Sequence, residues 1–257
     1  MGRVPRVRRR KRLGFSYRFA VVLLYPFMRT LVKWDIRGSE HLTDEPGGVI
    51  AAPNHVSWFD PLVVSYVLWT SDRPPRVLAK EAMFRIPVIG RIITNAEQIP
   101  VYRESTDAAS AIRDALVALD EGECVVVYPE GTITRDPAMW PMSAKTGAVR
   151  LALMSGRPLI PIAQRGAQEV MRPYRKEFRI LPRKTMHVRV GPPVDLSGLD
   201  TPPDGQALAE GGNRLMDAIT HLLAEIRQEP VPATRFVFHK DAEESSANAD
   251  SRTEEAQ

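Results

Sequence analysis

The sequence GVIAAPNHVSWFD at residues 48–60 decides how this chain is expected to fold. Its first part, Gly48–Ala52, is a short apolar run closed by a proline, which predicts a buried strand. An apolar run from Pro61 to Trp69 follows and is long enough for a helix. The peptide between the two runs is therefore predicted to be a strand-to-helix corner, and it contains His55 and Asp60.

His55 and Asp60 can meet only in one kind of corner. Residues five apart on a helix lie about 140° apart, so His55 must lie in the loop and Asp60 in the first helical turn. The carboxylate then holds one ring nitrogen and leaves the other free to take a proton. A second interpretation stays open, because Ser57-x-x-Asp60 before an apolar run is also typical of a capping box. In that case Asp60 is a capping residue and His55 an ordinary loop residue.

Length and composition indicate a globular protein. A chain of 257 residues is expected to form about one large domain with a sizeable core. Its hydrophobic and charged fractions, 44% and 26%, are ordinary for a folded protein. The single cysteine, Cys124, excludes an internal disulfide framework and a cysteine-based metal site. It lies in the apolar run Cys124–Tyr128, which predicts an unreactive core thiol.

The two ends of the chain differ in charge. Arg3–Arg12 holds seven Arg or Lys residues and no acid, which suits anionic phosphates. Asp241–Gln257 is rich in Glu, Asp, Ser and Ala and predicts a solvated, disordered tail. Nucleic acid would be another partner for a basic arm, but no recognised nucleic-acid module follows it, so none is expected.

An apolar segment, Phe19–Met28, follows the basic arm and contains Pro26. It has about half the length that a spanning helix needs. No small-residue cleavage site follows it, which argues against a signal peptide. We expect a helix or helical hairpin at the membrane surface, with Arg and Lys at phosphate level and the protein peripheral or monotopic on the cytoplasmic face of the cell membrane. Insertion across the bilayer, or a helix packed on the domain, remains an alternative.

The rest of the chain alternates short strands and helices, which predicts a single α/β domain with a largely parallel central sheet flanked by helices. We assign residues 1–34 to the basic arm and membrane-surface helix, 35–230 to the domain, and 231–257 to the acidic tail. The expected strands are 35–38, 48–52, 76–80, 97–101, 123–128, 158–163 and 186–190, and the expected helices are 61–69, 88–94, 106–120, 144–154 and 206–227.

Two further motifs end predicted strands. Tyr128–Thr132 follows the strand that begins at Cys124, and ligands of parallel sheets bind beyond the carboxyl ends of strands. Ile99–Arg103 ends on an arginine close to a helix start, where the guanidinium and free backbone N–H groups suit phosphate. Arg135 and Lys145 are within reach of the Tyr128–Thr132 loop and could also meet phosphate, but a surface role for these basic residues would look the same.

The absence of several motifs excludes some other classes of enzyme. A serine-hydrolase elbow, a phosphate-binding Gly-Lys loop and a dinucleotide fingerprint are all missing from the sequence. The remaining histidines are scattered, which speaks against a zinc site. A strand at Pro158–Ala163 contains Pro161, which predicts an edge or otherwise special position that shapes a pocket wall.

Four motifs in this order resemble the glycerolipid acyltransferase family, in particular bacterial 1-acylglycerol-3-phosphate (lysophosphatidic acid) acyltransferases. They are Asn54-His55-x4-Asp60, Val101-Tyr102-Arg103, Tyr128-Pro129-Glu130-Gly131-Thr132 and Leu159-Ile160-Pro161-Ile162-Ala163, within residues 35–195. Two positions depart from the family pattern: Ile133-Thr134 separate Glu-Gly-Thr from Arg135, and the later Lys-Gly pair is Lys145-Thr146-Gly147.

The resemblance implies acyl transfer from acyl-CoA or acyl carrier protein to the sn-2 hydroxyl of 1-acylglycerol 3-phosphate, giving phosphatidic acid. It makes His55 the general base and Asp60 its orienting partner. The substrate-binding residues implied are Asn54, Arg103, Glu130, Gly131, Thr132, Arg135 and Lys145. No metal or organic cofactor is expected, and the expected partners are a lysophospholipid, the thioester donor and an anionic membrane. Glycerol 3-phosphate, another lysophospholipid or a glycolipid as acceptor, and a non-enzymatic lipid- or nucleic-acid-binding module, are the alternatives.

Overall fold

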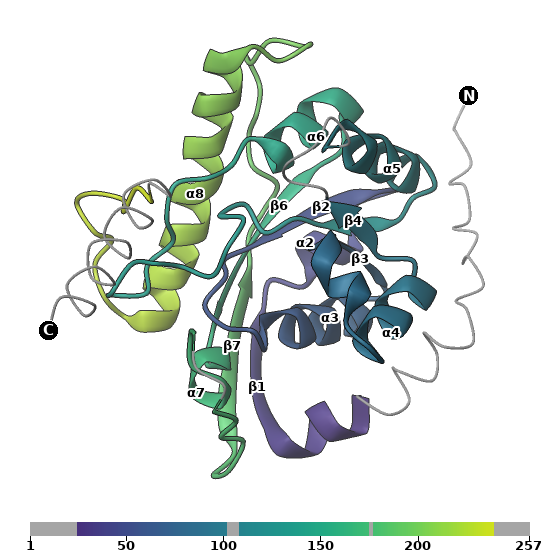
Figure 1. The fold of residues 1–257 in the computed structure, drawn as a ribbon. Coiled ribbons are helices and arrows are strands. Elements are labelled where there is room, and N and C mark those ends of the chain that lie inside the picture. The colour runs from purple at the N-terminus through teal and green to yellow at the C-terminus, as the bar shows by residue number, and fades with distance from the viewer. Residues whose placement is uncertain (1–24, 102–107, 175–176, 239–257) are drawn as a thin grey trace, which may run out of the picture.

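A seven-stranded sheet in the order β1-β7-β6-β2-β5-β3-β4 forms the centre of the molecule in the computed structural model, which describes residues 25–101, 108–174 and 177–238 (Figure 1). Every neighbouring pair of strands is parallel except β6 and β7, which confirms the predicted α/β class and largely parallel sheet. The strands are β1 (Val32–Arg37), β2 (Val49–Pro53), β3 (Pro75–Lys80), β4 (Ile99–Val101), β5 (Cys124–Val126), β6 (Leu159–Arg165) and β7 (Lys184–Val190).

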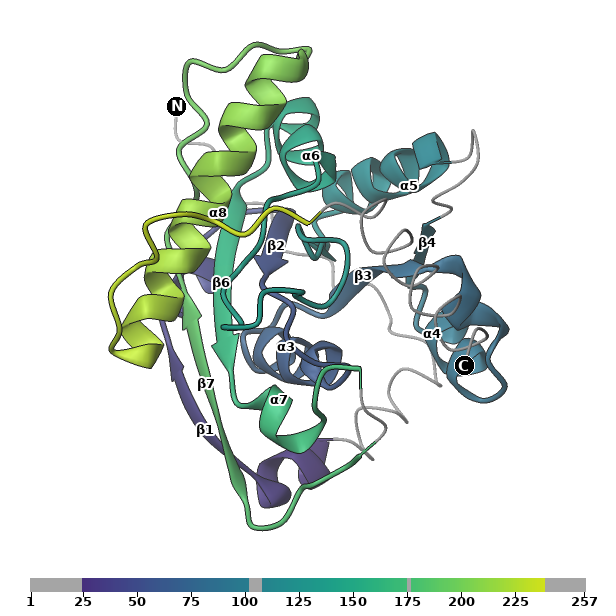
Figure 2. The ribbon, with the colours of Figure 1, turned by 60° about the vertical axis from the view of Figure 1, so that its left-hand side comes forward.

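Helices cover both faces of this sheet (Figure 2). The two-residue period of the strands separates two cores: in β2, Val49 and Ala51 pack with α2, α3 and α7, whereas Ile50 and Ala52 pack with α5, α6 and α8. Cys124 is buried in the first of these cores, as predicted, and forms no disulfide. The helices are α2 (Glu40–Thr43), α3 (Asp60–Thr70), α4 (Ile89–Asn95), α5 (Ala108–Asp120), α6 (Gly147–Ser155), α7 (Ala167–Val170) and α8 (Gly205–Arg227), with a 3₁₀ helix, η1 (Glu81–Arg85).

The long helices agree with the sequence periodicity, and their ends have local causes. α6 ends at Gly156, which adopts the left-handed conformation that a C-terminal cap requires. α8 begins after Asp204, whose carboxylate accepts the N–H of Ala207. The predicted start of α5 at Thr106 lies outside the described residues. The short elements α2, η1 and α7 were not predicted, because each is too brief to show a helical period.

Pro161 lies in an interior strand, not at an edge of the sheet. β6 pairs with β2 on one side and with β7 on the other. The ladder with β7 begins at Ile162, and beyond it the carbonyl of Pro161 accepts the N–H of Gly191. The proline therefore lies just past the last paired residue of this ladder, where its missing N–H is tolerated.

The basic arm and most of the predicted membrane-surface helix, residues 1–24, lie outside the described residues. The chain enters the described region as a helix at Tyr25–Leu31. Tyr66 of α3 stacks with both Tyr25 and Trp34, with ring centroids 5.3 Å and 4.0 Å apart. In the described part of the chain, no helix has both the length and the apolar character needed to cross a bilayer.

The segment at residues 231–238, which follows the predicted domain boundary, makes contacts with the domain. The carbonyl of Phe236 accepts the N–H of Ser143, and the Arg235 guanidinium forms an ion pair with Asp217 of α8. The apolar residues between 231 and 238 explain why this segment packs on the domain, in contrast to the polar sequence that follows.

Candidate active site

The turn at residues 54–59 joins the central strand β2 to α3, and it holds a histidine–aspartate pair. His55 Nδ1 lies 2.8 Å from Asp60 Oδ2. Asp60 is the first residue of α3 and is fully buried, while the His55 side chain remains 13% exposed. The corner geometry predicted from the sequence, with His55 in the loop and Asp60 in the first helical turn, is confirmed.

One oxygen of Asp60 accepts three hydrogen bonds. Besides the His55 ring, the backbone N–H groups of Val56 and Ser57 donate to Oδ2, at 2.5 and 2.8 Å. Burial raises the pKa of Asp60, and the hydrogen bonds from His55 and the backbone oppose this shift. Asp60 closes the turn as a capping residue would and holds the imidazole as well, so the two interpretations of this carboxylate are compatible.

The acceptor role of Asp60 sets the protonation of the ring. An ionised carboxylate can only accept, so Nδ1 of His55 carries the proton and donates it to Asp60. This leaves Nε2 with a free lone pair, and no other described residue hydrogen-bonds to it. The ring of Tyr128 supports the imidazole from one side, with centroids 4.4 Å apart. The pair is thus arranged as a general base with a fixed orientation.

Glu130, for which a substrate-binding role was expected, is buried inside the protein. Its side chain is 2% exposed, and its two oxygens accept the N–H groups of His55, at 2.9 Å, and Met142, at 3.0 Å. Burial raises the pKa of this carboxyl to about 8, against the opposing effect of the two backbone donors. Both oxygens accept hydrogen bonds from the protein backbone, and one of them ties Glu130 to the turn at residues 54–59.

Asn54 is also engaged inside the protein. Its side chain is buried, its Nδ2 donates to the carbonyl of Gln164 and its Oδ1 accepts the N–H of Gln164. The Gln164 amide in turn donates to the carbonyl of Asn54. This reciprocal pair ties the end of β2 to β6. Gln164 was not predicted as a site residue, although a polar residue ending an apolar strand is a visible signal.

The turn at residues 54–59 also forms hydrogen bonds with Met171 and Thr134. The Ser57 hydroxyl donates to the carbonyl of Met171, just after α7, at 2.6 Å, and accepts the N–H of Phe59. The carbonyl of His55 accepts the N–H of Thr134 at 2.8 Å. Such preorganisation keeps the base in position without reorganisation during a reaction.

Lys145 lies next to Gly131 of the Tyr128–Thr132 loop. Gly131 adopts a positive φ of 71°, and a side chain there would lie 3.2 Å from Cγ of Lys145. The backbone N–H of Lys145 donates to the carbonyl of Pro129, and Lys145 is an exposed residue. Thr132 is half-buried in the same loop.

The other predicted basic residues are not brought together with His55 by any described contact. The Arg135 guanidinium lies over the ring of Tyr174, 3.9 Å from its centroid. Arg103 lies outside the described residues. Among the residues that the structure describes, no group of three or more His, Cys, Asp or Glu side chains could hold a metal ion.

The fold has a counterpart among solved structures. It is similar to the crystal structure of the 1-acyl-sn-glycerophosphate (LPA) acyltransferase PlsC from Thermotoga maritima, with a TM-score of 0.62 and 21% sequence identity over 81% of each chain. This likeness supports the arrangement of the sheet and helices.

Curated relatives carry the same name in several organisms. Proteins named 1-acyl-sn-glycerol-3-phosphate acyltransferase from Borreliella burgdorferi and Bacillus subtilis are each 31% identical to this chain, over 51% of its length and over 50% and 62% of theirs. The chloroplastic enzyme BAT2 from Brassica napus is 28% identical over 60% of this chain and 42% of its own. The chain thus spans about half the length of the curated relatives that it matches.

The family itself is shown by a match of the sequence pattern. Residues 33–165, just over half of the chain, match the family described as Acyltransferase. The matched segment runs from β1 to β6 and includes the His55–Asp60 pair, Glu130 and Gln164. The chain belongs to the Acyltransferase family.

Proposed function

We propose that the chain is an O-acyltransferase that moves a fatty acyl group from an acyl thioester to the sn-2 hydroxyl of 1-acylglycerol 3-phosphate, giving phosphatidic acid. The observation that carries this proposal is the His55–Asp60 pair at the end of the central strand, inside the family match. The names of the relatives support the choice of acceptor.

His55 acts as the general base in this proposal. Nε2 takes the proton of the acceptor hydroxyl while the oxygen forms its bond to the thioester carbonyl carbon. The tetrahedral intermediate collapses, the carbon–sulfur bond breaks, and the imidazolium returns the proton to the thiolate. Asp60 stabilises the imidazolium through Nδ1. A base in this position typically contributes about 10²- to 10⁴-fold in rate.

The acyl group passes directly from donor to acceptor in a ternary complex. A covalent route would need a nucleophilic side chain beside His55. Cys124 is buried in the core, and the Ser57 hydroxyl already donates to the Met171 carbonyl. These contacts support direct attack by the acceptor hydroxyl.

The acceptor's phosphate fixes the position of the reacting hydroxyl. We assign this task to Lys145 and Thr132 beside Gly131, together with Arg103, as the family resemblance implies. Lys145 supports the assignment, because it is an exposed residue beside Gly131, in the loop that also supplies Glu130 to the turn at residues 54–59. Arg135 is held against Tyr174 and enters the proposal only as a more distant positive charge.

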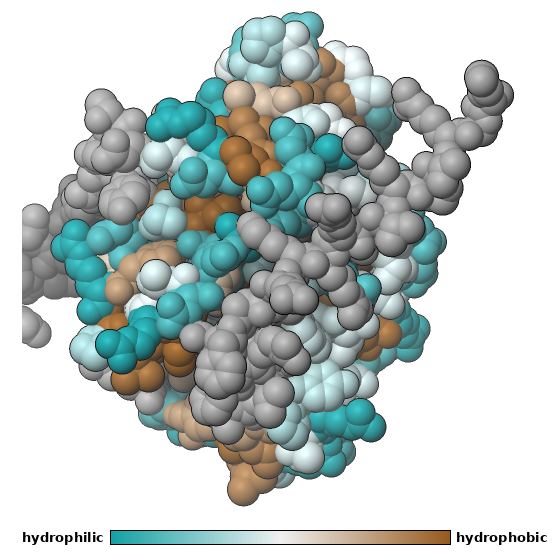
Figure 3. Space-filling view, turned by 90° about the vertical axis from the view of Figure 1, so that its right-hand side faces the viewer, coloured by the Kyte–Doolittle hydropathy of each residue, from teal (hydrophilic) through white to brown (hydrophobic). Residues whose placement is uncertain are grey.

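An apolar surface at η1 and α4 supports association with a membrane, where the lipid acceptor resides. Four large aliphatic side chains there are 39–72% exposed: Ile86, Val88, Ile89 and Ile92. Exposed Arg85 and Arg91 lie among them and match an anionic lipid surface. Figure 3 shows this side of the molecule, with hydrophobic residues at the surface between hydrophilic ones. Because acyl-CoA and acyl carrier protein are cytoplasmic donors, we place the enzyme on the cytoplasmic face.

The membrane surface can be tested by one substitution. Replacing the exposed Ile89 by Asp should lower binding to vesicles that contain phosphatidylglycerol about tenfold, because a charge enters the apolar face. Sedimentation with vesicles measures the effect, and Val117→Asp on exposed α5 is the control. Equal binding of the wild type and Ile89→Asp would show that this face does not meet the bilayer.

The reaction is tested with purified protein in mixed micelles. Palmitoyl-CoA is the donor, and lysophosphatidic acid or glycerol 3-phosphate is the acceptor. We expect phosphatidic acid from lysophosphatidic acid, and its loss in His55→Ala. Product from glycerol 3-phosphate alone would keep the chemistry and change the acceptor. Full activity of a folded His55→Ala protein would refute the mechanism.

A further inference from the structure

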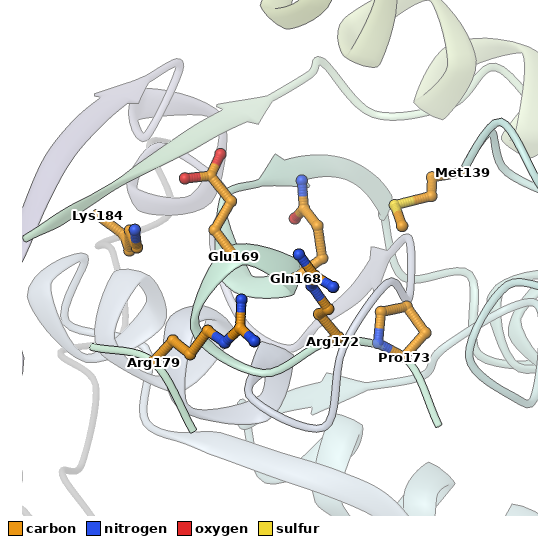
Figure 4. Close-up of a pocket in the computed structure, with 7 residues that line it drawn as sticks. All are labelled: Met139, Gln168, Glu169, Arg172, Pro173, Arg179 and Lys184. Atoms are coloured by element: carbon orange, nitrogen blue, oxygen red, sulfur yellow. The ribbon is translucent and has the colours of Figure 1, made fainter. Parts of the chain in front are cut away.

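A basic cavity lies beside α7, close to the hydrogen bond between Met171, which follows α7, and Ser57 of the turn at residues 54–59. Its volume is about 620 Å³, which is within the range of small-ligand sites. Figure 4 shows its lining, which comes from the loop before α6, from α7 and the segment after it, and from the first residue of β7. The lining residues are Met139, Gln168, Glu169, Arg172, Pro173, Arg179 and Lys184.

Three cations and one carboxylate line this cavity. Arg179 forms an ion pair with Glu177 at 2.6 Å. No side-chain hydrogen bond or ion pair joins Arg172 or Lys184 to another described residue, although the backbone of Lys184 is paired with β1. Glu169 lies on the side of Lys184 in Figure 4. Bringing several cations to one cavity is unfavourable by itself, and an anion relieves this repulsion. Two arginines and a lysine together are typical of phosphate recognition.

The cavity is close to His55 without opening directly on it. Met139 and Gln168 also line a second cavity of about 80 Å³, which Val56 shares. Met171, next to Arg172, accepts the hydrogen bond of Ser57, and the ring of Phe178 meets the ring of Phe59 edge-on at 6.2 Å. The basic cavity is therefore adjacent to a smaller cavity that Val56, the residue after His55, also lines.

We propose that the basic cavity binds a phosphate group of the carrier part of the acyl donor, with Arg172 and Lys184 as its principal ligands. This inference rests on the proposed thioester donor. In coenzyme A, the sulfur and the phosphates are at opposite ends of a long pantetheine arm, so a phosphate site at some distance from His55 suits the donor. The acceptor's phosphate is only a short glycerol unit from the reacting hydroxyl and must bind nearer to Nε2.

The kinetic test compares donor and acceptor in a double variant. In Arg172→Gln/Lys184→Gln, we expect the KM for palmitoyl-CoA to rise about tenfold or more, because two charged hydrogen-bond donors are lost. The kcat and the KM for lysophosphatidic acid should not change. A matched control is Arg113→Gln/Arg150→Gln, which removes two charges from α5 and α6. An unchanged KM for the donor, or a raised KM for lysophosphatidic acid alone, would overturn the proposal.

A binding measurement separates this inference from the proposed function. Isothermal titration calorimetry with free coenzyme A should show about tenfold weaker binding to the double variant than to the wild type and the control. If the wild type binds coenzyme A but does not acylate lysophosphatidic acid, the proposed acceptor fails and the donor site stands. If acylation is normal and coenzyme A binds equally well to all three proteins, the donor site fails and the proposed function stands.

Discussion

Two histidine–aspartate pairs in this chain have nearly the same geometry and very different surroundings. His55 Nδ1 is 2.8 Å from Asp60, and His187 Nδ1 is 3.0 Å from Asp35. The first pair lies at the carboxyl end of the central strand β2, and the second spans β1 and β7 at the end of the sheet where β1 is the outermost strand.

The surroundings of the two carboxylates differ most. Asp60 is fully buried, has backbone N–H groups as its other donors, and belongs to a turn fixed by neighbouring strands. Asp35 is 30% exposed and also pairs with the Arg189 guanidinium at 2.7 Å. The Arg189 hydrogen bond, followed by that of His187, holds the pKa of Asp35 well below its usual range. Because the charge of Asp35 is already neutralised by Arg189, it does little to stabilise an imidazolium at His187. The second pair is therefore part of a partly exposed ion-pair network.

The comparison between the two pairs predicts the largest loss of activity when His55 is replaced. His55→Ala removes the proposed general base, so kcat should fall about 10³- to 10⁴-fold while the protein stays folded. Acyl transfer and circular dichroism are measured together. His187→Ala, which removes the histidine of the second pair, should keep wild-type activity. Equal losses in both variants would show that the two pairs are not functionally different.

A smaller loss of catalytic activity is expected for Asp60→Asn. All three hydrogen bonds reach Oδ2, so the amide oxygen of Asn can take this position and keep the imidazole oriented. The negative charge that stabilises the imidazolium is lost, and kcat should fall about 10²-fold or more. The KM for lysophosphatidic acid should stay constant, because Asp60 does not face the acceptor. A raised KM with normal kcat would contradict this role.

Glu130, which accepts the N–H of His55, should make the free energy of unfolding depend on pH. Its folded-state pKa of about 8 is above the ordinary value of 4.5, so between these values the unfolded chain binds fewer protons than the folded protein. The free energy of unfolding therefore falls as pH rises from 5 to 8, by about 3 kcal/mol from this group.

Urea unfolding of wild type and Glu130→Gln at pH 5 and pH 8 measures this contribution, since glutamine does not titrate. The wild type should lose more stability over this interval than the variant. Parallel pH dependence in the two proteins would show that Glu130 does not titrate between pH 5 and pH 8.

The smallest effect is expected at the second pair. Asp35→Asn should lower the free energy of unfolding by at most about 1 kcal/mol, because the network is partly exposed and screened by salt. Since the pKa of Asp35 is lowered in the folded state, its contribution is present above about pH 4 and is lost as pH falls further. Thermal unfolding at low and high salt should show a difference between wild type and variant only at low salt.

The sequence predicted the fold well where the signal is local. All seven strands were predicted, because apolar runs of the right length between turn residues show a buried parallel strand directly. The His55–Asp60 contact was also predicted, because only five positions separate the two residues and one loop geometry allows them to meet.

What the sequence could not determine are the contacts between distant segments. Asn54 and Gln164 are 110 positions apart, Glu130 and His55 are 75 apart, and Ser57 and Met171 are 114 apart. A motif shows that a polar residue is near the site, but its partner depends on which strands become neighbours. The motif thus places Glu130 near the site, but only the structure shows that its oxygens accept the backbone N–H groups of His55 and Met142.

The sequence alone determined the strand-to-helix corner and the contact between His55 and Asp60, because backbone geometry acts over a few residues. Only the tertiary structure decided that Asn54 and Glu130 hold this corner, and that Arg172, Arg179 and Lys184 line one cavity beside it. The physical reason is that burial and charge proximity depend on the packing of β2 between β5 and β6, and no local pattern specifies that packing.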